Sequence, residues 1–246
     1  MSTLFLIPTE MERKLFLAAW RQRQGTAFSG RLEICGFGPI ASAAVSMMLL
    51  QRIRPNQVYL LGIAGSYDLK LAEVGSAHCF GAVVTDAVGA ESRDGIQYPS
   101  EMGLAQVAEH HVAFEDPIHS NRLGFPVSST ASHGLVKSIF QRIDLSVPED
   151  PGKLLLTVGH ASGSVASAEN RRQRFPGIAA DQEIVAEDME GFSVAMACRL
   201  MGIGLTIIRG ISNQAGDRLI KHWEIDLALD QVAALCDQRC ESVADV

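Results

Sequence analysis

VAEDMEGFSVA, at residues 185–195, and IIRGISNQAGDR, at residues 207–218, are the two stretches that decide how this chain folds. The first places Glu190 at the start of an apolar helix, with Val194 on the same face, so that the carboxylate points inward. An inward carboxylate is costly unless a partner compensates its charge. The second is an apolar strand that ends in Arg-Gly-Ile-Ser-Asn, which brings Asn213 to a carboxyl end, where open α/β sheets bind ligands. We therefore expect an acid and an amide to converge on one cleft.

Short apolar strands alternate with amphipathic helices along the chain. The predicted strands are residues 4–7, 32–35, 58–61, 78–85, 154–158 and 205–208. The predicted helices are residues 10–24, 39–52, 133–140, 167–175, 188–201 and 222–242. This alternation predicts an α/β fold in which helices flank a mixed, mostly parallel central sheet.

The length and composition favour one domain, residues 1–246, over two small ones. Of the 246 residues, 47% are apolar, which is enough for a large core. The chain contains no repeat or low-complexity tract, and its most loop-like stretch, SVPEDPG at residues 146–152, is too short to separate domains.

The charge balance argues against a nucleic-acid partner. The formal net charge is −7 at pH 7, and the isoelectric point is near 5.5, so the chain would repel a phosphate backbone. The basic cluster of Arg171, Arg172 and Arg174 is expected to lie on a solvated helix face.

The amino terminus lacks the pattern of a signal peptide or a membrane span. Its apolar run, residues 4–7, is short and no basic segment precedes it. The cysteines are scattered and odd in number, unlike a disulfide framework. They are Cys35, Cys79, Cys198, Cys236 and Cys240. We expect a cytoplasmic protein without a membrane partner, whose cysteines act as small buried apolar residues.

Two glycine-bearing segments follow predicted strands. The first, residues 36–41, resembles a dinucleotide-binding fingerprint, which also needs an acid about 20 residues further on. No Asp or Glu occurs between Ile34 and Tyr67, so we expect a tight turn for close approach of a ligand or backbone, and no nicotinamide cofactor. The second, residues 62–66, predicts a turn that either ends a strand or offers backbone N–H groups to a sugar or anion.

One histidine-containing tract has metal-ligand residue types, but their spacing matches no familiar site. It comprises His110, His111, Glu115, Asp116 and His119. The sequence also lacks a G-x-S-x-G elbow and a Walker A motif. We therefore expect neither a metal nor a cofactor, and no acyl-transfer or ATP-hydrolysing activity.

The first strand leads into two acids, Glu10 and Glu12, in the first turn of a helix. Glu10 fits ordinary charge favoured by the helix dipole. Glu12 is a candidate base toward water, Glu190 a candidate for holding ribose hydroxyls, and Asn213 a candidate for holding a purine edge. Those three roles are what hydrolysis of an N-glycosidic bond requires.

From residue 4 to about residue 232, the chain resembles the nucleoside phosphorylase and nucleosidase superfamily, and most of all its futalosine branch. The motifs are PTEME at 8–12, GFGPIASA at 36–43, GIAG at 62–65, DAVGAESRDG at 86–95, DMEG at 188–191 and RGISNQAGDR at 209–218, followed by Trp223. The last motif is the most specific. PTEME lacks the Gly-Asp-x-x-Arg pattern of bacterial purine phosphorylases, so the resemblance implies hydrolysis rather than phosphorolysis.

The resemblance implies cleavage of futalosine to hypoxanthine and dehypoxanthine futalosine, in a route to menaquinone. It also implies a homo-oligomer that binds a small-molecule nucleoside, with Glu12 and Asn213 as catalytic residues. The implied substrate-binding residues are Gly65, Ser167, Met189, Glu190, Phe192 and Arg218. Phe192 or a partner subunit would stack on the base, and Arg93 or Arg218 would meet the carboxylate of the benzoate tail.

Adenine-releasing relatives carry Asp at the position of Asn213. A 6-oxopurine presents acceptors at N7 and O6, and the amide NH₂ can donate to them. Asn cannot protonate the leaving group, so hydrogen bonding would stabilise a departing hypoxanthine anion. Two alternatives stay open: a nucleosidase of the methylthioadenosine or S-adenosylhomocysteine type, and a nucleoside-binding protein without catalysis.

Overall fold

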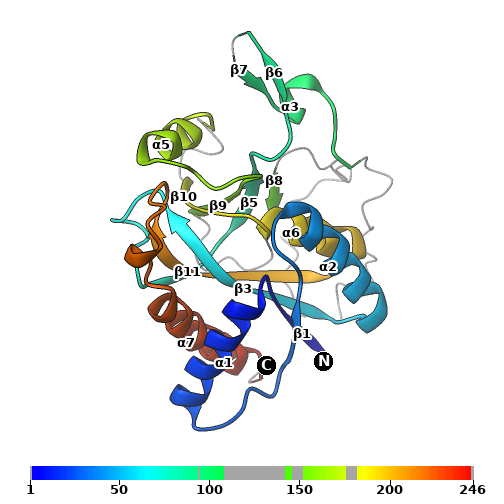
Figure 1. The fold of residues 1–246 in the computed structure, drawn as a ribbon. Helices are drawn as coiled ribbons and strands as arrows, with labels where there is room; N and C mark the ends of the chain where they lie inside the picture. Colours follow the sequence, from blue (N-terminus) through cyan, green and yellow to red (C-terminus); the bar gives the residue numbers. More distant parts are fainter. Residues whose placement is uncertain (1, 94, 108–141, 146–151, 176–181, 245–246) are drawn as a thin grey trace.

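The part of the chain that the structure describes contains a nine-stranded mixed sheet (Figure 1). This computed structural model describes residues 2–93, 95–107, 142–145, 152–175 and 182–244. The sheet follows the order β2-β1-β3-β10-β9-β5-β8, and β11 pairs with β3 and β4. Its strands are β1 (Thr3–Ile7), β2 (Arg31–Ile34), β3 (Gln57–Ser66), β4 (Ala77–Cys79), β5 (Ala82–Thr85), β8 (Arg142–Asp144), β9 (Lys153–Thr157), β10 (Glu183–Asp188) and β11 (Gly204–Gln214).

Most neighbouring strands are parallel, which confirms the predicted fold class. β1 is parallel to β2 and β3, β11 is parallel to β3, and β9 is parallel to β10 and β5. The antiparallel pairs are β3 with β10, β4 with β11, and β5 with β8. The sheet is therefore mixed, with helices on both faces.

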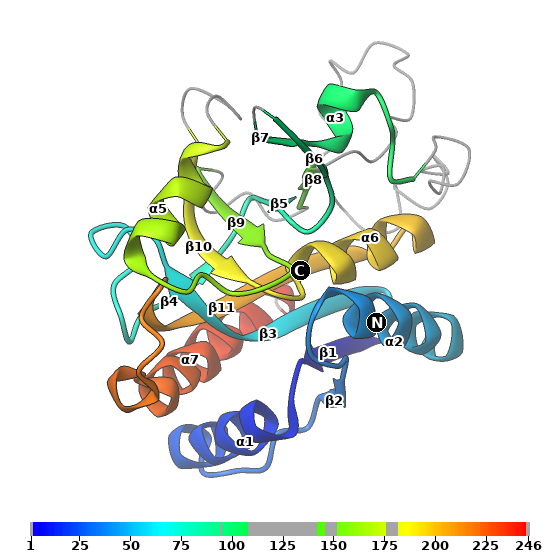
Figure 2. The same ribbon diagram turned by 45° about the horizontal axis from the view of Figure 1, so that its top comes forward.

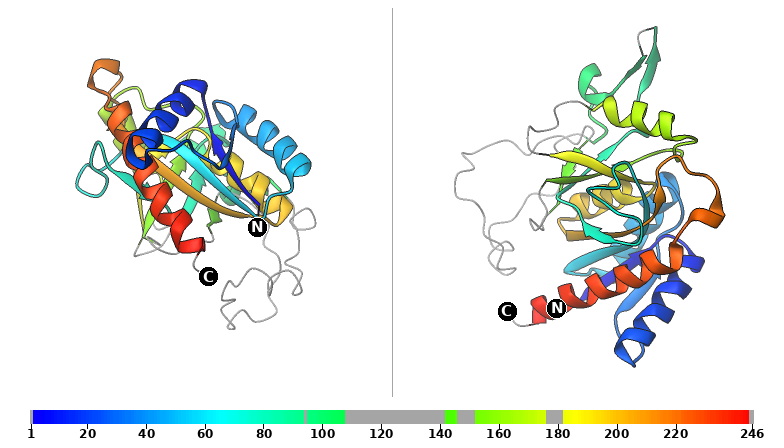
Figure 3. Two further views of the ribbon diagram at one scale, coloured as in Figure 1. Left: turned by 90° about the horizontal axis from the view of Figure 1, so that it is seen from below. Right: turned by 90° about the vertical axis from the view of Figure 1, so that its left-hand side faces the viewer.

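Helices α2 and α6 cover one face of the sheet, and α1 and α7 cover the other (Figures 2 and 3). The helices are α1 (Glu10–Gln24), α2 (Pro39–Ile53), α5 (Val165–Gln173), α6 (Gly191–Met201) and α7 (Ile225–Ala244). Shorter elements are the hairpin β6 (Ala90–Ser92) and β7 (Gly95–Gln97), α3 (Pro99–Met102), and the 3₁₀ turn η2 (Ile220–His222).

Strand β1 shows how both faces of the sheet are built. Leu4 and Leu6 pack into the core beneath α2 and α6, while Phe5 and Ile7 pack into the core beneath α1 and α7. Successive side chains of a strand point to opposite faces, so a strand buried on both faces needs a continuous apolar run. That run places Glu12, on the helix that follows, at the edge of the sheet.

Two strands are longer than predicted, because each continues through glycine. The predicted turn at residues 62–66 is wrong, since β3 runs to Ser66 and stays paired with β11. In β11, a Cβ at Gly210 would overlap the Ala228 carbonyl, so this glycine lets α7 pack directly on the strand. Glycine, which usually weakens a strand, here allows close packing.

Other elements differ in their boundaries. The predicted strand 78–85 is divided into β4 and β5, and the predicted helix 188–201 starts only at Gly191. β10 and the β6–β7 hairpin were not predicted, because both contain acidic residues that weaken an apolar strand pattern. The predicted helix at 133–140 lies outside the described residues. None of the helices in the described ranges is long and apolar enough to span a membrane.

Candidate active site

Arg209 of β11 is fully buried and lies at the centre of the candidate site. Its guanidinium donates to Oδ2 of Asp188 from Nη2 at 2.6 Å and from Nε at 3.1 Å, and Nη1 donates to the Leu61 carbonyl at 2.8 Å. Nη2 also lies 3.4 Å from Oε2 of Glu190. Burial alone would lower the pKa of Arg209, but the carboxylates around it raise the pKa, so the guanidinium stays charged. Arg209 is thus the partner that the inward carboxylate of Glu190 requires.

Glu190 is buried at the N-cap position of α6. Its Oε1 accepts a hydrogen bond from the backbone N–H of Gly38 at 2.9 Å. Burial raises the pKa of Glu190 to about 7, against the opposing effect of Arg209, and the negative charges of Asp188 and Glu12 raise it as well. The carboxylate therefore changes its protonation close to neutral pH.

Thr9 caps α1 and fixes Glu12 in the first turn of that helix. The Thr9 hydroxyl accepts from the Glu12 N–H at 3.2 Å and donates to Oε2 of Glu12 at 2.5 Å. The N–H of Ile63, on β3, donates to Oε1 at 3.2 Å. Burial raises the pKa of Glu12, although the Thr9 hydroxyl and the charge of Arg209 oppose the rise. A positioned carboxylate of raised pKa suits a general base near neutral pH.

Glycines let these charged groups approach the backbone. A Cβ at Gly62, whose φ is +148°, would overlap the Arg209 guanidinium and lie 3.0 Å from Oε1 of Glu12. The predicted tight turn before α2 is present, because Gly38 has a φ of +81° and donates its N–H to Glu190. Gly38 therefore provides a backbone donor for Glu190, and Gly62 leaves room for Arg209 and Glu12.

Asn213 lies near the end of β11 and is buried. Its Oδ1 accepts from the Ser212 hydroxyl at 2.8 Å, while Nδ2 donates to the Gln214 carbonyl at 2.8 Å. Nδ2 also approaches the Asp217 carbonyl at 3.4 Å, and the indole N–H of Trp223 donates to that same carbonyl at 3.0 Å. These partners fix which end of the amide is the donor, and the 3.4 Å contact is the weaker of its two donor contacts.

Three of the predicted substrate-binding residues lie beside this cluster as part of the fold. Phe192 is buried in the core, and its N–H donates to the Thr157 hydroxyl at 2.7 Å. Met189 is partly buried against the apolar residues of β5 and β9. Gly65 belongs to β3, where a Cβ would lie 3.3 Å from Cα of Ala215.

Ser167 and Arg218 have exposed positions. Ser167 forms a capping box with Ser164 at the start of α5, in which each side chain accepts from the other residue's N–H. The guanidinium of Arg218 lies over the Trp223 ring, 5.2 Å from its centroid. Contact of either residue with a substrate stays a prediction.

The predicted solvated arginine face is wrong for one of its three members. Arg171 is buried and pairs with Asp86 at 2.7 Å, whereas Arg174 is exposed and Arg172 lies 3.7 Å from Asp68. Neighbouring residues of a helix point in directions about 100° apart, so a cluster in sequence does not form one face.

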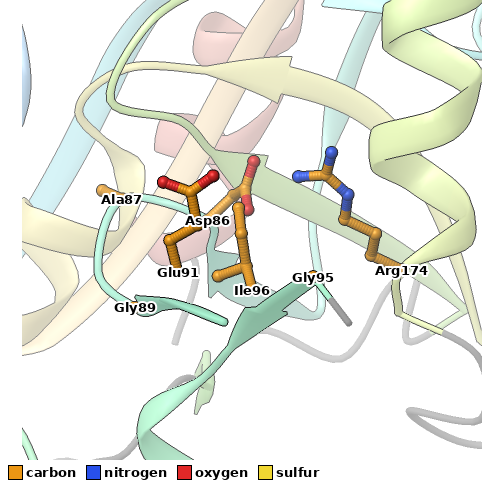
Figure 4. A pocket seen from close by; sticks show the side chains of 7 residues that line it. All are labelled: Asp86, Ala87, Gly89, Glu91, Gly95, Ile96 and Arg174. Carbon is orange, nitrogen blue, oxygen red and sulfur yellow. The ribbon is translucent and has the colours of Figure 1, made fainter. Parts of the chain in front are cut away.

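A cavity of about 550 Å³ lies beside the β6–β7 hairpin. In Figure 4, the carboxylates of Asp86 and Glu91 lie on one side of this cavity, and the guanidinium of Arg174 extends toward them from the end of α5. Its lining includes none of the predicted catalytic residues. The candidate site is therefore the buried cluster around Arg209.

Arg209 and Asp188 determine the geometry of the site, although neither was assigned a role from the sequence. An arginine inside the apolar run IIRGI is the signal that could have identified Arg209, because a buried guanidinium requires carboxylate partners. Within the described ranges, no group of three His, Cys, Asp or Glu residues is placed to hold a metal ion. The histidine-containing tract at residues 110–119 lies outside those ranges.

Comparisons with known proteins identify the family of this chain. The family model described as the phosphorylase superfamily matches residues 18–245. The chain is 30% identical over 196 residues to a futalosine hydrolase of Acidothermus cellulolyticus, covering 80% of this chain and 69% of that protein. It is 27% identical to a 5'-methylthioadenosine/S-adenosylhomocysteine nucleosidase of Chromohalobacter salexigens, covering 80% of this chain and 75% of that protein.

Solved structures show the same fold. The chain is similar to the futalosine hydrolase of Helicobacter pylori, with a TM-score of 0.64, 14% identity and 98% of each chain covered. It is equally similar to a 5'-methylthioadenosine/S-adenosylhomocysteine nucleosidase of Neisseria meningitidis, with a TM-score of 0.64, 16% identity, and coverage of 98% of this chain and 100% of that chain.

Proposed function

This chain belongs to the phosphorylase superfamily, and we propose that it hydrolyses the N-glycosidic bond of futalosine to release hypoxanthine. The observation that carries the proposal is the placement of Glu12 and Glu190 around Arg209, with Asn213 fixed as a donor on the same strand as that arginine. The sequence relatives named futalosine hydrolase support the choice of substrate.

In the proposed reaction, Glu190 accepts hydrogen bonds from the ribose hydroxyls, and Glu12 accepts a proton from the attacking water. The bond between C1′ and the purine nitrogen breaks, and its electron pair leaves with the base. The water oxygen then bonds to C1′, the departing base takes up a proton from solvent, and Glu12 releases its proton to solvent. As in other glycosidic hydrolyses, positive charge develops on the sugar, and buried carboxylates stabilise it. Nδ2 of Asn213 exchanges its 3.4 Å contact with the Asp217 carbonyl for a hydrogen bond to the purine. This hydrogen bond stabilises the departing hypoxanthine anion.

Water fits this site better than phosphate does. Arg209 directs its donors to Asp188, Glu190 and the Leu61 carbonyl, so its charge is already compensated. A phosphate dianion beside it would also face the carboxylate of Glu12. This charge balance supports hydrolysis, in agreement with the absence of the Gly-Asp-x-x-Arg pattern from PTEME.

The test is chromatographic detection of free base after incubation with futalosine, inosine or methylthioadenosine, each with and without phosphate. We expect hypoxanthine from futalosine, independent of phosphate. Adenine from methylthioadenosine alone would favour the second candidate, a nucleosidase like the relative from Chromohalobacter salexigens. Dependence on phosphate would indicate a phosphorylase, and no base from any substrate would contradict catalysis.

Replacing Asn213 by Asp is expected to lower the preference for 6-oxopurines by about 100-fold or more. A carboxylate at this position would face the carbonyls of Gln214 and Asp217, and it could donate only when protonated. The measurement is the ratio of kcat/KM for futalosine to that for methylthioadenosine. Asn213→Ala is the matched control, because it removes the contact without offering a new one. An unchanged ratio in Asn213→Asp would show that another group selects the base.

The rate is expected to depend on pH through the buried carboxylates. Because the pKa of Glu190 is raised to about 7, the form that accepts from ribose is lost as the pH falls through neutrality, and kcat/KM should fall with it. Protonation of Glu12 removes the base in the same direction. In Glu12→Gln, the residual kcat/KM should still fall as the pH falls. The fall should occur at a lower pH, because the negative charge of Glu12 no longer raises the pKa of Glu190. A rate that is constant from pH 5 to 8 would contradict this assignment.

The remaining assignments extend the proposal. We propose that Gly65, Met189, Phe192, Ser167 and Arg218 surround the nucleoside, with Arg218 nearest the substrate's own carboxylate. The reaction would supply dehypoxanthine futalosine to menaquinone synthesis. The cytoplasmic location and the homo-oligomeric state stay predictions.

A further inference from the structure

A second buried polar network lies on the other face of β10 from Arg209. Because side chains alternate along a strand, Asp188 faces Arg209, whereas Glu187 faces the segment before α5. Glu187 and Arg171 are both buried, and Nη1 of Arg171 lies 3.4 Å from Oε2 of Glu187. One strand therefore provides a carboxylate to each of two buried arginines.

Ser162 connects this network to the backbone of the segment before α5. Its N–H donates to Oε1 of Glu187 at 2.8 Å, and its hydroxyl donates to Oε2 at 2.6 Å. The same hydroxyl accepts from Nη1 of Arg171 at 2.7 Å. Arg171 also reaches Nε2 of His160 at 3.0 Å and Asp86 at 2.7 Å. Four segments of the chain thus converge on one fully buried hydroxyl and its partners.

The other side of this segment lies against the turn that follows Asn213. Gly216 has a φ of +90°, and a Cβ there would overlap the carbonyl carbon of Ser164 and the amide nitrogen of Val165. Residues 162–165 are therefore held between Glu187 and the turn whose carbonyls orient the Asn213 amide. A shift of this segment would change the space beside Asn213.

From this placement we infer that Ser162, Glu187 and Arg171 form a positioning network that sets the affinity for the purine base. The inference rests on the proposed function, because it assumes that Asn213 contacts the base. The network lies on the other face of β10 from Arg209, away from the carboxylates proposed to act on the sugar and the water. Its loss should weaken binding of the base, while the chemical step changes little.

The experiment compares Ser162→Ala with Tyr67→Phe. Tyr67 donates to the same Oε2 of Glu187 at 2.6 Å, but it lies beyond the end of β3 and not in the segment before α5. Each variant removes one hydroxyl from the same carboxylate, and both should lose stability, Ser162→Ala more so because its hydroxyl also accepts from Arg171. The readouts are the melting temperature, kcat and KM for the cleaved nucleoside, and the dissociation constants of free hypoxanthine and adenine.

In Ser162→Ala, we expect the dissociation constant of the base and KM to rise about tenfold or more, because the hydroxyl loses its hydrogen bonds to both Glu187 and Arg171, while kcat changes less than about threefold. Tyr67→Phe should leave base binding unchanged. Equal effects of the two variants on base binding, or a loss of stability alone in Ser162→Ala, would overturn the positioning role. If Ser162→Ala does not fold, Arg171→Lys serves instead, because one ammonium cannot reach all the partners of the guanidinium.

Base binding needs no turnover, which separates this inference from the proposed function. If the wild-type protein binds hypoxanthine or adenine without cleaving any nucleoside, the proposed function fails, and the comparison of variants still decides the positioning role. If the wild-type protein binds neither base, the inference fails as well.

Discussion

Replacing Glu12 by Gln is expected to lower kcat by about 10²- to 10⁴-fold, the range for loss of a positioned acid–base group. The amide keeps the shape of the side chain, and its oxygen still accepts from the Ile63 N–H, as Oε1 does at 3.2 Å. The amide cannot take a proton from water. Because the ribose contacts of Glu190 remain, KM should change only a few-fold. The measurement is steady-state release of free base at pH 8, above the pKa of about 7 of Glu190.

Glu10→Gln is the matched control for this prediction. Glu10 lies in the same helical turn, but it is exposed and pairs with Arg13 at 2.8 Å. Surface pairs of this kind contribute little, so this variant should keep its full rate and stability. A Glu12→Gln enzyme whose kcat lies within about threefold of the wild type would remove Glu12 from the mechanism.

The sequence was sufficient to predict where Glu12 and Glu190 lie along the fold, because both positions follow from strand ends and helix starts. Glu12 lies in the first turn of α1, the helix that follows β1, and Glu190 directly precedes α6. Glu190 is buried, as predicted, and Glu12 is buried as well. The alternation of strands and helices likewise predicted the sheet and its flanking helices. A local sequence pattern predicts the position of a polar residue reliably when that residue lies next to a single apolar strand or helix.

The sequence did not predict the long-range pairs, since these depend on which strands become neighbours. Arg209 meets Asp188 across 21 residues and the Leu61 carbonyl across 148 residues. The burial of Arg171 depends on Glu187 in β10, a strand whose acidic end hid its apolar pattern. A buried charge in an apolar run signals that a partner exists, but it does not indicate which residue the partner is.

Replacing Arg209 by Met is expected to destabilise the protein by about 3–5 kcal/mol, the usual cost of removing one partner from a buried ion pair. The variant would leave Asp188 and Glu190 without their countercharge, and Glu12 would lose an attractive interaction as well. The measurement is chemical denaturation of the wild type and the variant at pH 8 and pH 5.5. Arg172→Met is the control, because Arg172 is partly exposed and lies 3.7 Å from Asp68, so its loss should cost under about 1 kcal/mol.

The pH dependence of the lost stability shows whether its cause is uncompensated charge or lost packing. The pKa of Glu190 is already raised in the wild type, and removal of Arg209 should raise it further. The folded variant then binds more protons than the unfolded chain between the unfolded and folded pKa values, so its stability falls as the pH rises through that window. The deficit should be largest at pH 8, smaller at pH 5.5, and partly relieved at pH 8 by adding Asp188→Asn. A deficit of equal size at both pH values would instead indicate lost packing, because removal of apolar contacts does not depend on protonation.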